Sequence, residues 1–168
     1  QFQLVYFSRN HQNFVDYDMT IFRYANATID FGVYGTEFLC HYPVTDRLLV
    51  QTNYTYTHHE EGEGLRIPKH KINASFRQHL NSNTQLLTSI QFVGDRNDKV
   101  GQDLVVLSSY WLLDFRISRQ LSQPGVSLLG SIENVFNSDY EEVKGYTTRG
   151  RNVSVGLIML SICLITLI

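Results

Sequence analysis

The sequence predicts an all-β protein built as an antiparallel meander of about eight strands. Two observations predict this fold class: polar and apolar side chains alternate with a period of two, and short turns alternate with long polar loops along the chain. The composition agrees, because aromatic residues reach 12% and charged residues only 18%. No segment shows the periodicity of a helix, so we expect strands throughout.

Each predicted strand has one apolar and one polar face. In residues 48–57 one face is formed by Leu48, Val50, Thr52, Tyr54 and Tyr56. The same alternation recurs in residues 71–79, 85–93, 110–118 and 151–157. With their flanking segments, the predicted strands are 2–8, 30–43, 47–58, 69–79, 84–94, 108–120, 126–136 and 150–160.

The connections between these strands are of two kinds. The short turns are rich in Pro, Gly, Asn, Asp and Ser and lie at 44–47, 81–84 and 122–125. The long polar loops lie at about 9–24, 58–67, 94–107 and 137–149. Short turns at one end of strands of about ten residues and long loops at the other are typical of outer-membrane barrels.

The chemistry of the two faces favours a membrane barrel over a soluble β-protein. Alternation by itself also fits a soluble sandwich or a small ligand-binding barrel. However, aromatic residues such as Trp111 and Phe115 populate the apolar face, as expected for a surface in contact with lipid. The polar face carries mid-strand residues that we expect to face the barrel lumen, namely Glu37, Asn53, Arg77, Asp114, Arg116 and Glu133. Charged side chains in such a lumen most often pair with one another.

Several functional classes are not expected for this chain. A formal net charge of −2 argues against a nucleic-acid partner, which requires a basic surface. Cys40 and Cys163 have no metal-ligand spacing, and no Ser-His-Asp, Cys-His or phosphate-binding motif is present. We therefore expect neither an enzyme nor a bound cofactor. The densest group of potential ligands is in the loop after residue 57 and comprises His58, His59, Glu60 and Glu61, followed by Glu63. A loop of this kind is usually only solvated, and contact with a ligand is a better-supported role for its residues than metal binding, so the first four of these residues are candidates for ligand contact.

Two ordered motifs carry a resemblance to a known family. The first runs from Gly35 and Glu37 through a short turn to the 48–57 strand and then to an R-x-P-x-H-x-x-N segment formed by Arg66, Pro68, His70 and Asn73. The second contains Asn134, Val135 and Phe136, then Tyr140, and then Gly150 and Arg151 before the last strand. Together these motifs, which cover most of residues 30–157, resemble the C-terminal barrel strands of TonB-dependent receptors of the siderophore and cobalamin type.

The resemblance implies a part of a large barrel in the bacterial outer membrane, in contact with its lipid. Members of this family take up bulky, scarce nutrients, such as ferric siderophores, haem or cobalamin. Their barrel is filled by a plug domain and driven by contact with TonB, and we expect neither the plug nor the TonB-contacting segment in this chain. Barrels of 22 strands are wide enough to hold such a plug.

The ends of the chain depart from the family pattern. The first residues show no export signal, and the apolar run after Leu157 contains no aromatic residue, whereas the family ends on one. We therefore expect a partial barrel over residues 1–158 and an atypical apolar tail over 159–168, which either a shifted reading frame or a degenerate gene end would explain. The alternative is a small self-contained barrel or sandwich that binds a ligand or has a structural role, because eight strands can close a barrel.

Overall fold

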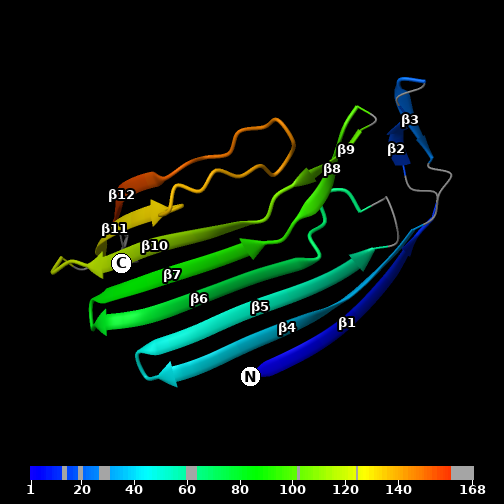
Figure 1. Cartoon of the computed structure of the whole chain (residues 1–168). Helices are drawn as coiled ribbons and strands as arrows, with labels where there is room; N and C mark the ends of the chain where they lie inside the picture. Colours follow the sequence, from blue (N-terminus) through cyan, green and yellow to red (C-terminus); the bar gives the residue numbers. More distant parts are fainter. Residues whose placement is uncertain are drawn as a thin grey trace, which may run out of the picture.

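The protein folds into one long, curved antiparallel sheet. The computed structural model describes residues 1–12, 15–18, 21–26, 31–59, 64–101, 103–123 and 125–159. Its main sheet has eight strands in the order β1-β4-β5-β6-β7-β10-β11-β12, so strands that follow one another along the chain are neighbours in the sheet (Figure 1). In the described residues no helix is long and apolar enough to cross a membrane. The predicted all-β meander is therefore confirmed.

The eight predicted strands correspond one to one with the strands of the main sheet. These are β1 (Phe2–His11), β4 (Phe31–Thr45), β5 (Leu48–His59), β6 (His70–Asn81), β7 (Thr84–Val93), β10 (Tyr110–Gln120), β11 (Val126–Glu133) and β12 (Asn152–Met159). The largest differences, of three residues each, are at the ends of β1 and β11; β11 stops at Glu133 rather than at 136. The next residue, Asn134, has a φ of 49°, and this left-handed conformation cannot continue a strand.

The structure contains two short hairpins that the sequence did not predict, both in the region of predicted long loops. One is formed by β2 (Val15–Asp18) and β3 (Arg23–Asn26) and begins in the predicted loop 9–24 and ends just beyond it; the other is formed by β8 (Arg96–Val100) and β9 (Asp103–Leu107), within the predicted loop 94–107. In the second hairpin the turn passes through Gly101 at a φ of 64°, which glycine adopts without strain. β8 was not predicted because its residues are mostly charged or polar and show no alternation of apolar and polar side chains.

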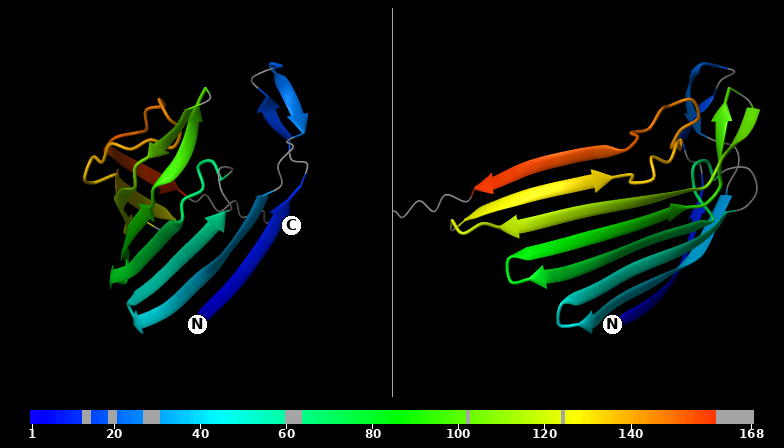
Figure 2. Two further views of the ribbon diagram at one scale, coloured as in Figure 1. Left: turned by 45° about the vertical axis from the view of Figure 1, so that its right-hand side comes forward. Right: turned by 60° about the vertical axis from the view of Figure 1, so that its left-hand side comes forward.

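The two ends of the sheet have different kinds of connection, as the sequence predicts. Tight turns join β4 to β5, β6 to β7 and β10 to β11 at one end, which we call the turn end. Both hairpins and the long connection between β11 and β12 lie at the other, which we call the loop end (Figure 2). The register between neighbours is continuous except for shifts at Pro43/Thr45 and His79/Asn81, both beside tight turns.

The apolar face of the sheet is left uncovered. Leu4 is 74% exposed, Trp111 50% and Val155 77%, and all three are on this face. Among the described hydrophobic residues only Val93, Leu107 and Tyr110 are buried. A soluble sandwich would cover this face with a second sheet, and the described residues form no such layer. The face is suited to contact with lipid hydrocarbon instead.

The main sheet is open at both edges. β1 pairs only with β4, and β12 pairs only with β11 among the described strands. An unpaired edge presents a row of unsatisfied backbone donors and acceptors. The structure therefore corresponds to part of a barrel wall, and the alternative of eight strands closing on themselves is not what it shows.

Candidate functional site

The polar face of the sheet carries two rows of hydrogen-bonding side chains, of which only Asp114 is a carboxylate. Because side chains alternate along each strand, residues paired across neighbouring strands share a face. The first row contains Gln3, Asn53, Asn73 and Gln91, in which Asn53 pairs with Asn73 and Asn73 with Gln91. The second row, one step nearer the turn end, contains His41, Gln51, Ser75, Ser89 and Asp114.

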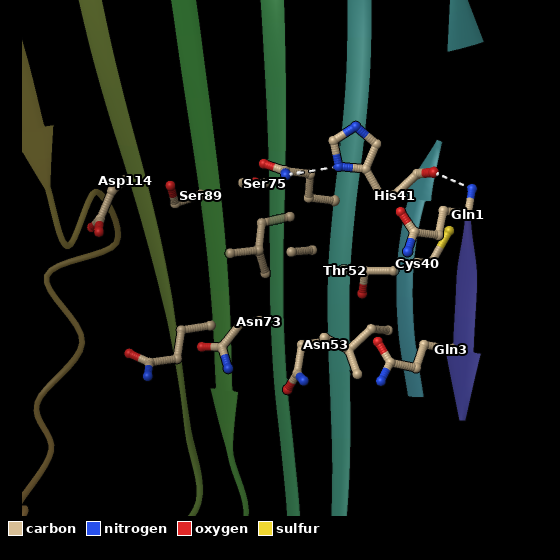
Figure 3. Close-up of a pocket in the computed structure, with 15 residues that line it drawn as sticks. Gln1, Gln3, Cys40, His41, Thr52, Asn53, Asn73, Ser75, Ser89 and Asp114 are labelled. Carbon is tan, nitrogen blue, oxygen red and sulfur yellow. Dashed lines mark hydrogen bonds between the residues drawn. The ribbon is translucent and has the colours of Figure 1, made fainter. Parts of the chain in front are cut away.

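The two rows line a cavity of about 570 Å³ on the polar face. Figure 3 shows Asn53 and Asn73 at one level and Ser75 and Ser89 at the next, contributed by β5, β6 and β7. Gln51 Nε2 and His41 Nδ1 lie 3.0 Å apart, which fixes both side chains across β4 and β5. Amide and hydroxyl groups both donate and accept hydrogen bonds. The cavity can therefore bind a polar ligand of low net charge.

The six residues predicted to face the lumen all lie on the polar face, but they do not form one site. Asn53 and Asp114 line the cavity, whereas Glu37, Arg77, Arg116 and Glu133 do not. Glu133 lies 3.9 Å from Arg116 and 3.7 Å from Arg149, so these charges mainly compensate one another. Exposed pairs of this kind contribute little to stability. That any of the six contacts a ligand stays a prediction.

The predicted ligand-contacting loop is divided between the two faces of the sheet. His58 lies on the apolar face with its ring 4.7 Å from that of Tyr34, whereas His59 has the opposite parity and packs close to Gly64. Glu60 and Glu61 are outside the described residues. No group of three His, Cys, Asp or Glu residues within the described ranges could hold a metal ion. The role of this loop in ligand contact stays a prediction.

The residues of the first family motif have mainly structural contacts. Gly35 lies under the ring of Phe7, and Thr55 Oγ1 lies 3.5 Å from Glu37 Oε1. His70 is on the apolar face, where its Nδ1 lies 2.9 Å from the hydroxyl of Tyr54. Pro68 is half-buried in the segment that leads into β6. Of the residues named for this motif, which are Gly35, Glu37, Arg66, Pro68, His70 and Asn73, only Asn73 lines the cavity.

The residues of the second family motif build the junction between β11 and its long loop. The side chain of Asn134 accepts a hydrogen bond from Ser138 N at 2.8 Å and donates one to Ser138 O at 2.9 Å, while its backbone N donates to Asp114 Oδ1. Asn137 Oδ1 accepts from Arg151 N and lies close to Gly150, where a Cβ would approach it to 2.9 Å. Phe136 is 67% exposed.

A polar cluster at the loop end joins three segments that are distant in sequence. We call it the loop cluster; it comprises Arg66, Arg96, Asp98, Tyr110, Glu142 and Lys144. Its centre is the carboxylate of Asp98, whose residue is 0% exposed. Arg66 Nε donates to Asp98 Oδ1 at 2.8 Å, and the backbone N of Lys144 donates to Asp98 Oδ2 at 2.8 Å. A buried charge requires such partners.

The second half of the loop cluster is built on Tyr110, the first residue of β10. Its hydroxyl donates to Glu142, and its ring lies 4.3 Å from that of Tyr140. The guanidinium of Arg96 lies 5.1 Å from the Tyr110 ring centroid, and Arg96 also donates to the backbone oxygen of Glu141. Tyr110 has the parity of Asp114, so the loop before β12 lies over the polar face.

Sequence reasoning missed both the cavity and most of the loop cluster. Gln3, Ser89 and Gln91 are ordinary residues of polar strand faces, and only the register aligns them into rows. Asp98 is separated from Arg66 by 32 residues and from Lys144 by 46. The alternation of Arg96 and Asp98 in the RND segment was the one local signal that could have suggested a paired hairpin.

Comparison with known proteins places this geometry among outer-membrane receptors. No protein-family model matches the chain. An iron-regulated outer membrane virulence protein of Vibrio cholerae is 24% identical over 135 residues, which are 74% of this chain and 21% of that protein. The chain thus spans about a fifth of the length of this curated relative. The name of this relative agrees with the location expected from the sequence.

Solved structures of receptors share the fold. FpvA of Pseudomonas aeruginosa, bound to heterologous pyoverdines, has a TM-score of 0.77 at 16% identity over 94% of this chain and 24% of its own. The ferric-catecholate import receptor Fiu of E. coli gives 0.72 at 15% identity, with 94% and 25% covered. The FrpB iron transporter of Neisseria meningitidis gives 0.74 at 16% identity, with 94% and 28% covered.

By their names, Fiu is an import receptor and FrpB is an iron transporter. Each is covered over about a quarter of its length. The single curved sheet, its apolar face and its short turns opposite long loops are typical of part of an outer-membrane barrel. The chain therefore has the fold of part of the barrel of TonB-dependent outer-membrane siderophore receptors, the family that its sequence resembles.

Proposed function

We propose that this chain forms part of the wall of an outer-membrane receptor that takes up iron bound to a siderophore. The observation that carries the proposal is the division of one sheet into a lipid-suited face and a polar face with a cavity. The iron-related names of the similar proteins support iron as the cargo. Haem and cobalamin, which the sequence resemblance also allows, find no comparable support.

In the complete receptor, the polar face lines the interior and contacts a plug domain, and uptake depends on TonB. The row of amide side chains supports this role, because amides can hydrogen-bond either to a polar ligand or to the backbone of a protein segment. The long loops and both hairpins, at the opposite end from the tight turns, form part of the outer mouth. The apolar face contacts outer-membrane lipid.

The complete reading frame that encodes this chain provides the test. Expressed in a host without its own siderophore receptors, it should restore accumulation of radioactive iron from at least one class of ferric siderophore, hydroxamate or catecholate. The same host without TonB should show no accumulation. A receptor that reaches the outer membrane but takes up no ferric siderophore, or takes up only haem or cobalamin, would overturn the proposal.

A further inference from the structure

We propose that Asp98 is the central residue of a clamp that makes three segments at the loop end move as one body. The segments are the residues before β6 around Arg66, the β8–β9 hairpin, and the loop between β11 and β12 around Lys144. The proposal concerns the motion of the loops over the polar face. It holds whichever ligand the receptor carries, so it does not depend on the proposed function.

The geometry of Asp98 supports this role, because each of its carboxylate oxygens serves a different segment. Oδ1 accepts from Arg66 Nε at 2.8 Å and from the neighbouring Lys99 N at 2.9 Å, whereas Oδ2 accepts from Lys144 N at 2.8 Å. Both oxygens of the side chain therefore accept hydrogen bonds while the residue is 0% exposed. A charge in this position is stable only when all three segments are in place.

Backbone contacts join the first segment to the hairpin independently of side chains. Leu65 forms a parallel bridge with Asn97, and Arg66 N donates to Asn97 O at 2.7 Å. Arg66 itself has a φ of 61°, a left-handed conformation that a residue with a side chain adopts at a cost unless its surroundings hold it there. The salt bridge from its guanidinium to Asp98 supplies that constraint.

The clamp fixes the last loop over the polar face. Lys144 N reaches Asp98 from a turn in which Lys144 Nζ pairs with Glu141 at 2.8 Å. The contact between the tilted rings of Tyr140 and Tyr110 then keeps the loop on the side of the sheet that carries the cavity. Loss of the Asp98 carboxylate removes the hydrogen bond that joins the β8–β9 hairpin to the loop between β11 and β12. This loop should then open away from the hairpin.

Replacing one oxygen of Asp98 tests the clamp. In Asp98→Asn, the amide nitrogen that takes the place of an oxygen cannot accept a hydrogen bond, so either Arg66 or Lys144 N loses its acceptor. We expect the amides of Lys144 and Arg66 to exchange with deuterium about tenfold faster, as measured by mass spectrometry on the complete protein in membranes. Asp103→Asn makes the same charge change in the same hairpin and should leave both amides unchanged.

A second variant covers the case in which Asp98→Asn does not assemble. Arg66→Gln removes the ion pair but leaves both backbone donors of Asp98 in place, and it should accelerate exchange at Lys144 by about two- to fivefold. The clamp is refuted if the variants that assemble leave exchange at Lys144 equal to that of Asp103→Asn. It is equally refuted if exchange rises at one segment alone, because the three would then move independently.

The stability of the clamp should also depend on pH, and the contacts of Asp98 determine the direction of this dependence. Burial would raise the pKa of Asp98, but hydrogen bonds from Lys144 N, Lys99 N and Arg66, with the charge of Arg66, outweigh burial and hold the pKa below its usual value. The charged groups around it are Arg66, Arg96, Lys99, Glu141, Glu142 and Lys144.

A carboxylate whose pKa is lowered in the folded protein contributes fully to stability above the ordinary Asp pKa of about 4. This contribution is lost as the pH falls through the lower pKa of the folded state. Lowering the pH from about 7 to about 5 should therefore leave the protection of the Lys144 amide unchanged after correction for the intrinsic rate. A drop to about 2.5 should reduce it. The amide of Gly94, which donates to His70 O within the sheet, is the internal reference. Loss of protection already at pH 5 would contradict the assignment to Asp98.

Discussion

Ile90→Arg should lower the free energy of unfolding by about 2–4 kcal/mol in a lipid bilayer, the cost measured for arginine near the middle of a lipid-facing strand. Ile90 lies on the apolar face of β7, where it pairs with Ala74 on one side and Leu113 on the other. An arginine there would place its charge against hydrocarbon. Equilibrium unfolding of the protein in phosphatidylcholine bilayers measures the loss.

The neighbouring residue supplies the matched control. Gln91→Arg introduces the same side chain one position along β7, on the polar face beside Asn73 and within the cavity lining. We expect a change of no more than about 0.5 kcal/mol, because this side chain remains in a polar environment. Equal losses for the two variants would show that the apolar face does not contact lipid.

Gly35→Ala should destabilise the barrel wall by about 1–3 kcal/mol, which is the usual cost of inserting a methyl group into a packed site. A Cβ at Gly35 would overlap the backbone oxygen of Tyr56 and lie 2.6 Å from Cζ of Phe7. The phenyl ring can rotate, but the backbone oxygen belongs to the ladder between β4 and β5 and cannot move without breaking pairing. Unfolding in the same bilayers measures this loss.

Gly156→Ala is the control for a glycine within a strand. Gly156 lies in β12, and a Cβ there would meet no atom within 4 Å. We expect this variant to be as stable as the parent or slightly more stable, since alanine restricts the unfolded chain. If Gly35→Ala is as stable as Gly156→Ala, β4 and β5 do not lie as close together at Gly35 as described.

The faces of the strands could be predicted from the sequence because alternation is a local property. In β5, Val50 and Tyr54 were assigned to the apolar face and Asn53 to the polar face, and the register of the sheet places them so. The tight turns could also be predicted from the sequence, because their residues favour turn geometry by themselves. The predicted end of β11 was wrong because the left-handed conformation of Asn134 depends on Ser138 and Asp114.

The candidate site could be predicted only in part. Asn53 and Asp114 were identified as polar mid-strand residues, and both line the cavity. His58 and His59 were treated as one group, yet adjacent residues of a strand point to opposite faces, and the structure separates them. Such a group can act together only in a loop, and β5 extends to His59.

The sequence by itself determined that this protein is an antiparallel meander with one lipid-suited and one polar face, because strand periodicity and turn chemistry involve residues close together in the chain. Only the tertiary structure decided that Gln3, Asn53, Asn73 and Gln91 form one row and that Asp98 joins Arg66 to Lys144. Those contacts depend on pairing register and on loops that meet across tens of residues. No local pattern encodes either of them.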